Sequence, residues 1–519
     1  MLENILIVAC ASLIVKIFMC LKHSTSFDGY GHLYFVKEIR TQNGGLFKGI
    51  KTKNIDGVGE FRHPFFWHYC LSYFPAESLL QWGRCLNPLL DSVFATSIYF
   101  FCIGAGFSSE VAFYASLLYI FTPMWFSSLS LGPRVSGVTP RLFSEICTNL
   151  FFMTTLLPLN TPFPLRLLLG GGFSFVVLAS SKFGLQALLF LTPMIALFSM
   201  NILPFVCVLL GLAMVLLFSK GEFLGVMKTQ CRHLIWYFKN NKLKKMHVSN
   251  RNDSCMLFDW RKGDSLTRNC LRMLYRALIH NSYTGVLLKM PILPLLFVLI
   301  IVNWKEALTL WCLLGPVVAA TILFLAINHR LLLFLGEAER YLNHVAFFIT
   351  TSFAVLNEGN AWFLKGLMLY GIAFCFVEVL GLPKLQKNTD SPNNEICDSG
   401  VIEWINKSNK ELRILCYPYH AVGVYKIMLL TDKEVLFPAL SCLNDEKWMR
   451  DFERYDEGYP YVRLCFLDEM EAQYGINFLI LDKKDMSKRG YINWVPPDHW
   501  EKLNIGGDVY DVYFSNLHE

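Results

Sequence analysis

Residues 185–218 read LQALLFLTPMIALFSMNILPFVCVLLGLAMVLLF and contain no charged side chain. About 20 consecutive apolar residues are enough for a helix to cross the hydrocarbon core of a bilayer. The stretch belongs to a longer apolar region, 142–219, which turn signals rich in Asn, Pro, Ser and Gly interrupt at 160–162, 180–184 and 201–204. At about 20 residues for each crossing, this region predicts four membrane-spanning helices.

Other apolar runs lie on both sides of this region. They are found at 2–21, 88–106, 110–130, 287–303, 306–327, 343–357 and 361–381. The chain of 519 residues is 54% hydrophobic and only 17% charged, whereas soluble domains carry about 25% charge. This composition excludes a soluble enzyme, a fibrous protein and a disordered one. It predicts a polytopic α-helical membrane protein with about eleven transmembrane helices.

The last part of the chain differs in charge from the rest. Residues 385–519 hold 15 Lys+Arg and 23 Asp+Glu, so the preceding residues hold 32 and 18. Apolar segments at 412–417, 476–481 and 509–513 resemble strands, and 445–456 and 467–474 have helical character. We therefore predict two domains, a transmembrane domain over 1–385 and a C-terminal α/β domain over 386–519.

Some common kinds of site have no support in the sequence. The chain has no glycine-rich phosphate-binding motif, so nucleotide binding is not indicated. The 16 cysteines are scattered, and no two have C-x-x-C spacing. They are expected to pack as small hydrophobic residues, not to bind metal.

Counting the spans predicts which segments share a side of the membrane. With the N-terminus in the cytoplasm, the loop with Asp28, the loop 131–141, the turn with Lys182, the segment 328–342 and the C-terminal domain all face outward. The same count places 220–285 outside, although it has 13 Lys+Arg against 4 Asp+Glu. The positive-inside rule favours the cytoplasm for such a loop, but it weakens for loops longer than about 60 residues.

The loop after the first apolar run carries the first candidate residues. Asp28 lies near Tyr30 and His32 at the predicted membrane boundary, where a carboxylate could take a proton from an acceptor. The alternative is an aspartate that caps a short helix starting at residue 29. Further along, His63 precedes Pro64 and an aromatic stretch. It either forms part of a cavity wall or belongs to an amphipathic helix on the membrane surface.

Three cations at predicted helix ends could bind a lipid phosphate. Arg134 and Arg141 flank a bend rich in Pro and Gly, and Lys182 lies in the shortest outward turn. Guanidinium groups bind phosphate oxygens in a bidentate manner. Arginines at helix ends also simply extend toward water, and Lys182 alone is also compatible with an ordinary loop lysine.

The densest group of charges near a predicted span is Glu337, Glu339, Arg340 and Tyr341. Charges beside hydrocarbon are costly, so such residues usually pair or face a wet cavity. Glu337 and Arg340 are three residues apart, and therefore an internal salt bridge within one helix is an alternative.

Taken together, these segments resemble the GT-C glycosyltransferases that use polyprenyl-phosphate sugars, in the branch of the protein O-mannosyltransferases and aminoarabinose transferases. The resemblance rests on SFDGYGHLY at 26–34 and RHPFF at 62–66. It also rests on the arginine-containing second outer loop, the Ser181-Lys182 hairpin, the Arg340-Tyr341 pair and an outward α/β tail. It covers 1–385 in organisation and the tail more loosely.

The resemblance implies roles for particular residues. Asp28 matches the acidic position of the first loop, which activates or orients the acceptor. The residues implied to bind the donor phosphate are Arg134, Arg141, Lys182 and Arg340. Those implied to line the substrate cavity are Tyr30, His32, His63, Glu337, Glu339 and Tyr341. Two motifs depart from the family pattern, because Gly29 replaces a second acidic residue and Phe65 replaces a second proline.

The expected function is transfer of a hexosyl or pentosyl unit from a polyprenyl-phosphate carrier to an envelope glycan, lipid or protein. The expected location is a bacterial inner membrane, with membrane lipids as partners and without nucleic acid. Some relatives bind a divalent metal near the site, but the sequence shows no ligand set specific enough to assign one here. The alternatives are a transporter or flippase of a lipid-linked saccharide, and an inactive relative that acts as a scaffold. Transporters often contain internal repeats, and none is apparent here.

Overall fold

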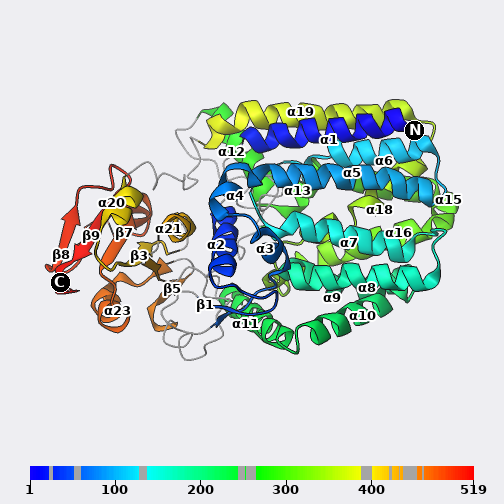
Figure 1. Cartoon of the computed structure of the whole chain (residues 1–519). Helices are drawn as coiled ribbons and strands as arrows, with labels where there is room; N and C mark the ends of the chain where they lie inside the picture. Colours follow the sequence, from blue (N-terminus) through cyan, green and yellow to red (C-terminus); the bar gives the residue numbers. More distant parts are fainter. Residues whose placement is uncertain are drawn as a thin grey trace.

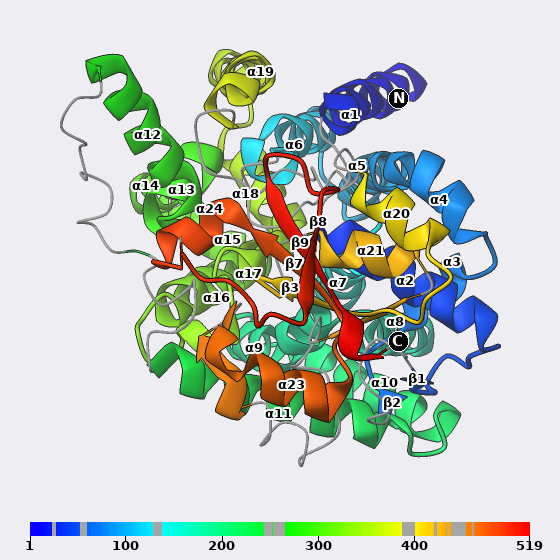
Figure 2. The same ribbon diagram turned by 90° about the vertical axis from the view of Figure 1, so that its left-hand side faces the viewer.

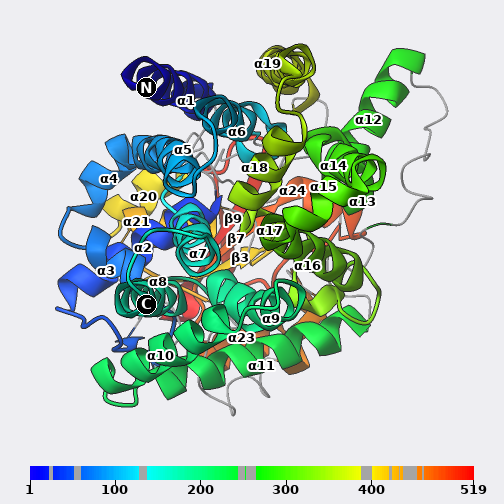
Figure 3. The same cartoon turned by 90° about the vertical axis from the view of Figure 1, so that its right-hand side faces the viewer.

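The computed structural model has a long helical bundle and a smaller α/β part at the end of the chain (Figure 1). It describes residues 1–22, 27–51, 60–127, 137–242, 252, 265–386, 400–419, 423–431, 433–436, 453–458, 461–491 and 493–518. Figure 3 looks along the bundle and shows many of its helices end-on. The α/β part covers the opposite end of the bundle, as Figure 2 shows from that side.

A helix lies at every place where the sequence predicts a membrane span. These helices are α1 (Leu2–Lys22), α5 (Leu86–Gly104), α6 (Ser109–Phe121), α7 (Pro140–Leu156), α8 (Phe163–Ser180), α9 (Lys182–Phe198), α10 (Leu203–Phe218), α14 (Ile292–Val302), α16 (Trp311–Ile327), α18 (Ala346–Leu356) and α19 (Ala361–Gln386). Their apolar side chains form one large core, which extends from α1 to α19.

Not all of these helices are long enough to cross a bilayer by themselves. Among the described residues, four segments are both long and apolar enough: Leu2–Leu21, Ala76–Gly104, Phe163–Ser180 and Ala361–Leu380. The number rises to six if each of two bent pairs is counted as one span, namely α10 with the following helix and α13 (Ser282–Lys289) with α14. Several others are apolar but shorter. The structure therefore confirms a polytopic helical membrane protein, and the number eleven remains a prediction.

A buried ion pair holds three parts of the bundle together. Lys16 on α1 lies 2.6 Å from a carboxylate oxygen of Asp91 on α5 and donates to the main-chain oxygen of Trp125 at 2.7 Å. The hydroxyl of Tyr119 on α6 also donates to Asp91. Isolated charges at this depth are costly, so each partner allows the other to remain buried. The lysine that interrupts the first apolar run thus has a structural role.

The loop after α1 folds into short elements between the bundle and the α/β part (Figure 1). They are α2 (Phe27–Thr41), β1 (Ile50–Lys51), β2 (Glu60–Phe61), α3 (Phe66–Leu71), α4 (Ala76–Trp82) and the 3-10 turn η2 (Gly83–Cys85). Tyr34 and Phe35 of α2 share a core with the α/β part. A Cβ atom at Gly31 would lie 3.1 Å from the ring of Tyr425, so a larger side chain there would require this ring to shift. We refer to residues 27–51 and 60–85 as the first-loop layer.

The end of the chain contains a mixed five-stranded sheet in the order β4-β3-β7-β9-β8. Strands β3 (Arg413–Tyr417), β4 (Glu434–Val435) and β7 (Phe478–Asp482) are parallel, whereas β9 (Tyr510–Ser515) and β8 (Trp500–Leu503) are antiparallel to their neighbours. The other elements are α20 (Val401–Lys407), α21 (Val424–Leu430), β5 (Asp456–Gly458), β6 (Tyr461–Val462), η9 (Leu464–Phe466), α23 (Leu467–Tyr474), α24 (Lys483–Lys488) and η10 (Asn516–His518).

Most elements predicted for this part are confirmed. The strands expected at 412–417, 476–481 and 509–513 correspond to β3, β7 and β9, and the helix expected at 467–474 is α23. The helix expected at 445–456 lies mostly outside the described residues. The proposed boundary at 385 falls in the last turn of α19, and it remains a prediction.

The basic segment after α10 begins on the same side as the first-loop layer and the α/β part. The chain bends by 117° into α11 (Phe223–Lys242). At the bend, Glu222 pairs with Arg62 of the first-loop layer at 2.7 Å. Further along, Lys239 lies 3.7 Å from Glu453 of the α/β part. These contacts place the start of this segment at the same end of the bundle as the first-loop layer and the α/β part, and the side of the membrane that this end faces remains a prediction. The segment continues through α12 (Leu266–Ile279) to α13.

Candidate functional site

Asp28 lies in the first turn of α2, and its side chain is exposed. The helix already begins at Phe27, so Asp28 is not a cap in front of a helix that starts at residue 29. A carboxylate in the first turn still interacts favourably with the helix dipole. Asp28 also interacts electrostatically with His32 on the same helix and with Arg141 on α7.

The first turns of α7 and α9 carry two of the predicted cations. Arg141 follows Pro140, the first residue of α7, and Lys182 is the first residue of α9, whose N-cap is Ser181. The two helix starts are packed closely, because a Cβ atom at Gly184 would overlap the side chain of Ser144. Helix N-termini favour anions, so a pair of them with attached cations provides a positively polarised surface.

The third cation comes from the segment before α18. This segment contains η6 (Leu333–Leu335), a glycine at 336 with φ +104°, and the short helix α17 (Arg340–Asn343). A Cβ atom at Gly336 would lie 3.1 Å from the ring of Phe183. The Cζ atom of the Arg340 guanidinium lies 3.8 Å from the centroid of the same ring. Phe183 directly follows Lys182 in the sequence. Phe183 thus connects this segment to the start of α9.

Arg340 is buried and only partly satisfied. It forms an ion pair with Glu337, as the spacing of three residues suggested. Its side chain is 9% exposed, and its Nε and Nη1 atoms have no hydrogen-bond partner among the described residues. Leaving a buried donor unsatisfied costs about 1–3 kcal/mol, and more for a charged group. The salt bridge alone therefore does not account for this side chain.

The three cations and Asp28 belong to one charged region. Arg141 interacts electrostatically with Arg340, Glu337 and Asp28. Lys182 interacts with His32, which also faces Asp28 and Arg141. Thus α2, α7, α9 and α17 each contribute a charged side chain. We call Arg141, Lys182 and Arg340 the cation cluster.

Three histidines of the first-loop layer form a neutral wall beside this cluster. His32 Nδ1 and His68 Nε2 are 2.8 Å apart, and the rings of His63 and His68 have centroids 5.7 Å apart. Burial lowers the pKa of His32 to about 4, helped by Arg141 and Lys182 and opposed by Asp28. Burial also holds the pKa of His63 and His68 well below the usual value. All three are therefore neutral at pH 7, so they add no charge to the site.

These low pKa values predict a loss of stability in acid. Because the unfolded chain binds a proton on each histidine near pH 6.5 and the folded chain does not, the free energy of unfolding falls as the pH drops below 6.5. His68→Gln removes one such group and can still hydrogen-bond His32. We expect its melting temperature to fall less between pH 6.5 and pH 5 than that of the wild type. The exposed His329 provides the control, His329→Gln, and equal slopes for all three proteins would refute the prediction.

The other predicted site residues make further contacts or lie outside the described residues. Tyr30 faces the α/β part, where Lys426 lies 5.4 Å above its ring. Glu339 accepts a hydrogen bond at 3.3 Å from Ser282 on α13. Tyr341 is 3% exposed, and its hydroxyl has no hydrogen-bond partner among the described residues. Arg134 lies outside the described residues, so its predicted role remains untested.

Sequence reasoning missed several residues of this region. Glu145 is buried one turn after Arg141, interacts with it electrostatically, and accepts a hydrogen bond at 3.3 Å from Asn343. Asn149, one turn further, donates to the main-chain oxygen of Asn343 at 2.8 Å. These bonds fix α17 against α7. The available signal was a carboxylate and an amide four residues apart inside an apolar run.

The described residues of this region do not bring together a set of metal ligands. Among all residues that the structure describes, one group of His, Cys, Asp or Glu has donors close enough to share an ion, and it lies in the α/β part.

Comparison with known proteins places the fold. No protein-family model and no curated protein matches the sequence. The solved structures with similar folds include two of one bacterial protein and one of an archaeal protein. ArnT from Cupriavidus metallidurans bound to undecaprenyl phosphate has 11% identity and a TM-score of 0.53, with 98% of this chain and 97% of that chain covered. Its apo form has 10% identity and a TM-score of 0.56 over the same shares.

The third structure is the Archaeoglobus fulgidus oligosaccharyltransferase in the apo form. It has 11% identity and a TM-score of 0.55, with 96% of this chain and 72% of that chain covered. At such identities the likeness concerns the fold. For the fold alone, it confirms the resemblance predicted from the sequence, and for ArnT it extends over nearly the whole of both chains.

Proposed function

We propose that this protein is an integral-membrane glycosyltransferase that takes a sugar from a polyprenyl-phosphate carrier. The acceptor is an envelope glycan, lipid or protein on the outer side of the membrane. The fold supports the class of enzyme, because similar folds occur in ArnT with undecaprenyl phosphate and in an oligosaccharyltransferase. The residues of the charged region support a donor that carries a phosphate group.

The observation that carries the proposal is the state of Arg340. Two of its guanidinium nitrogens are buried without a partner among the described residues, beside two helix N-termini that carry Arg141 and Lys182. A phosphate group has several acceptor oxygens and a negative charge, so it could satisfy these donors in a charge-assisted manner. A ligand without acceptor atoms would leave these two buried donors of Arg340 unsatisfied.

In the proposed reaction, an oxygen or nitrogen of the acceptor attacks the anomeric carbon of the donor sugar. The bond from this carbon to the phosphate oxygen breaks, and its electron pair leaves with the lipid phosphate. The cation cluster stabilises the added negative charge, which is the kind of electrostatic effect that dominates many transfer reactions. The exposed carboxylate of Asp28 takes the proton that the acceptor loses. The neutral histidines do not compete with the cations for the phosphate.

Mass spectrometry of cells with and without the gene tests this proposal. We expect cells without it to accumulate a polyprenyl-phosphate sugar and to contain an acceptor that lacks one sugar. A donor confined to the inner leaflet, with normal transfer in isolated membranes supplied with outward-facing donor, would instead indicate a flippase. No change in either the lipid or the acceptor pool would contradict the enzyme and favour a scaffold.

A further inference from the structure

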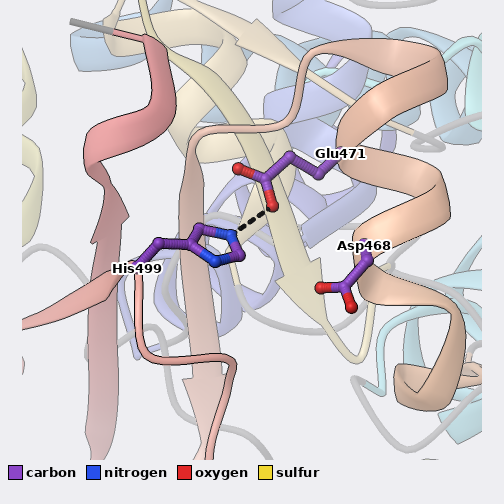
Figure 4. A group of neighbouring side chains, drawn as sticks. All are labelled: Asp468, Glu471 and His499. Carbon is purple, nitrogen blue, oxygen red and sulfur yellow. Dashed lines mark hydrogen bonds and ion pairs between the residues drawn. The ribbon is translucent and has the colours of Figure 1, made fainter.

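The α/β part contains a group of three side chains that converge far from the cation cluster in the fold. Asp468 and Glu471 lie three residues apart on α23, and His499 immediately precedes β8. Figure 4 shows the three side chains turned toward one another. One donor atom from each lies within 4.8 Å of the other two. We propose that Asp468, Glu471 and His499 bind a divalent cation of the zinc class.

The chemistry of the donors favours this class of ion. Mg²⁺ and Ca²⁺ take oxygen ligands, whereas an imidazole nitrogen suits Zn²⁺ and similar ions. Two carboxylates and a neutral imidazole carry a charge of −2, which a divalent cation compensates. Three protein ligands leave a fourth position of the tetrahedral zinc geometry for water. Asp468 is exposed, so this open position can face the solvent.

Glu471 is held in place for such a role. It is 4% exposed, and Trp500 Nε1 donates to its Oε2 atom at 3.2 Å. The hydroxyl of Ser515 donates to its other oxygen. Ligating carboxylates in metal sites are usually fixed by such hydrogen bonds from a second layer of residues.

The position of His499 indicates where the cation enters. Its Nε2 atom lies 2.8 Å from Glu471 Oε2, close enough for a single proton to bridge the two atoms. A cation bound between them replaces this bridging proton, which is released to the solvent. Metal sites commonly release protons in this way. The exposed carboxylate of Asp468 then turns onto the ion as the third ligand.

Such an ion would fasten α23 to one edge of the sheet. Glu471 and Asp468 are on the helix, whereas His499 leads into the edge strand β8, and Ser515 ends β9. Hydrogen bonds to Glu471 from His499, Trp500 and Ser515 already connect these elements. A bound cation adds metal–ligand bonds across the same junction, so it should stabilise the α/β part. The proposal does not depend on the proposed transferase activity.

Zinc binding to the full-length protein tests the inference. The protein is purified in detergent, stripped with a chelator, dialysed against Zn²⁺ and analysed for metal content. We expect one Zn²⁺ for each wild-type chain and a higher melting temperature with Zn²⁺. Asp468→Asn and His499→Gln should lower the zinc affinity at least about tenfold, since even outer-layer changes at metal sites cost this much. Both variants should lose the increase in melting temperature.

The variants also separate a metal site from a structural hydrogen bond. His499→Gln can still donate to Glu471, and Asp468 is exposed, so neither change should unfold the protein. Glu501→Gln, on the exposed face of β8, is the matched control and should bind zinc as the wild type does. The inference is overturned if the wild type retains no zinc, or if Asp468→Asn and His499→Gln retain as much as Glu501→Gln.

Discussion

Replacing Asp28 by asparagine should abolish sugar transfer and leave donor binding within a few-fold of the wild type. Asparagine has nearly the same shape but cannot take the proton of the acceptor. Loss of a general base typically lowers the rate by about 10²–10⁴-fold. Asp28 is exposed on α2 and interacts electrostatically with Arg141 of the cation cluster. The measurement is transfer in proteoliposomes with a synthetic donor, together with donor affinity.

Glu38→Gln provides a matched control for this change. Glu38 lies on the same helix, ten residues after Asp28, and accepts a hydrogen bond at 2.7 Å from Gln42. Its replacement also removes one negative charge from α2, so any general effect of charge would appear in both variants. Transfer at the wild-type rate in Asp28→Asn would remove this residue from the mechanism. A large loss of donor affinity would instead assign Asp28 to binding.

Much of the fold could be predicted because its signals are long or regular. An apolar run such as 185–218 predicts helices whatever their neighbours are. In the α/β part, short apolar segments at 412–417 and 476–481 predict β3 and β7. The order of strands in the sheet could not be predicted, since it depends on pairing between distant segments. The number of membrane spans cannot be derived from the apolar runs alone, because several bundle helices are shorter than a full crossing.

The site could be predicted only in part. Arg141, Lys182 and Arg340 stood out because charges near apolar runs are rare, and the structure brings them together. Sequence spacing does not show which way a side chain faces, so it could not predict that Glu339 accepts a hydrogen bond from Ser282 on α13. His68 was missed because its aromatic surroundings suggested a surface helix. Its role depends on the contact with His32, which lies 36 residues earlier.

Replacing Arg340 by alanine should weaken donor binding by about 10–100-fold. Hydrogen bonds to charged groups contribute about 1.5–3 kcal/mol, and each 1.4 kcal/mol is a factor of ten in affinity. The change removes the two unsatisfied guanidinium nitrogens proposed to face the phosphate. It also leaves Glu337 without its ion pair, so some loss of stability is expected. Donor affinity and melting temperature must therefore be measured on the same preparation.

Glu337→Gln distinguishes a phosphate site from a structural salt bridge. This variant removes the ion pair but keeps the guanidinium and its stacking on Phe183. If Arg340 binds the donor phosphate, Glu337→Gln should bind the donor at least as tightly as the wild type, because the cation is no longer neutralised. Arg340→Lys should bind with intermediate affinity, since lysine keeps the charge but not the planar fork. If Arg340→Ala and Glu337→Gln lower the melting temperature equally and neither changes donor affinity, the pair is purely structural.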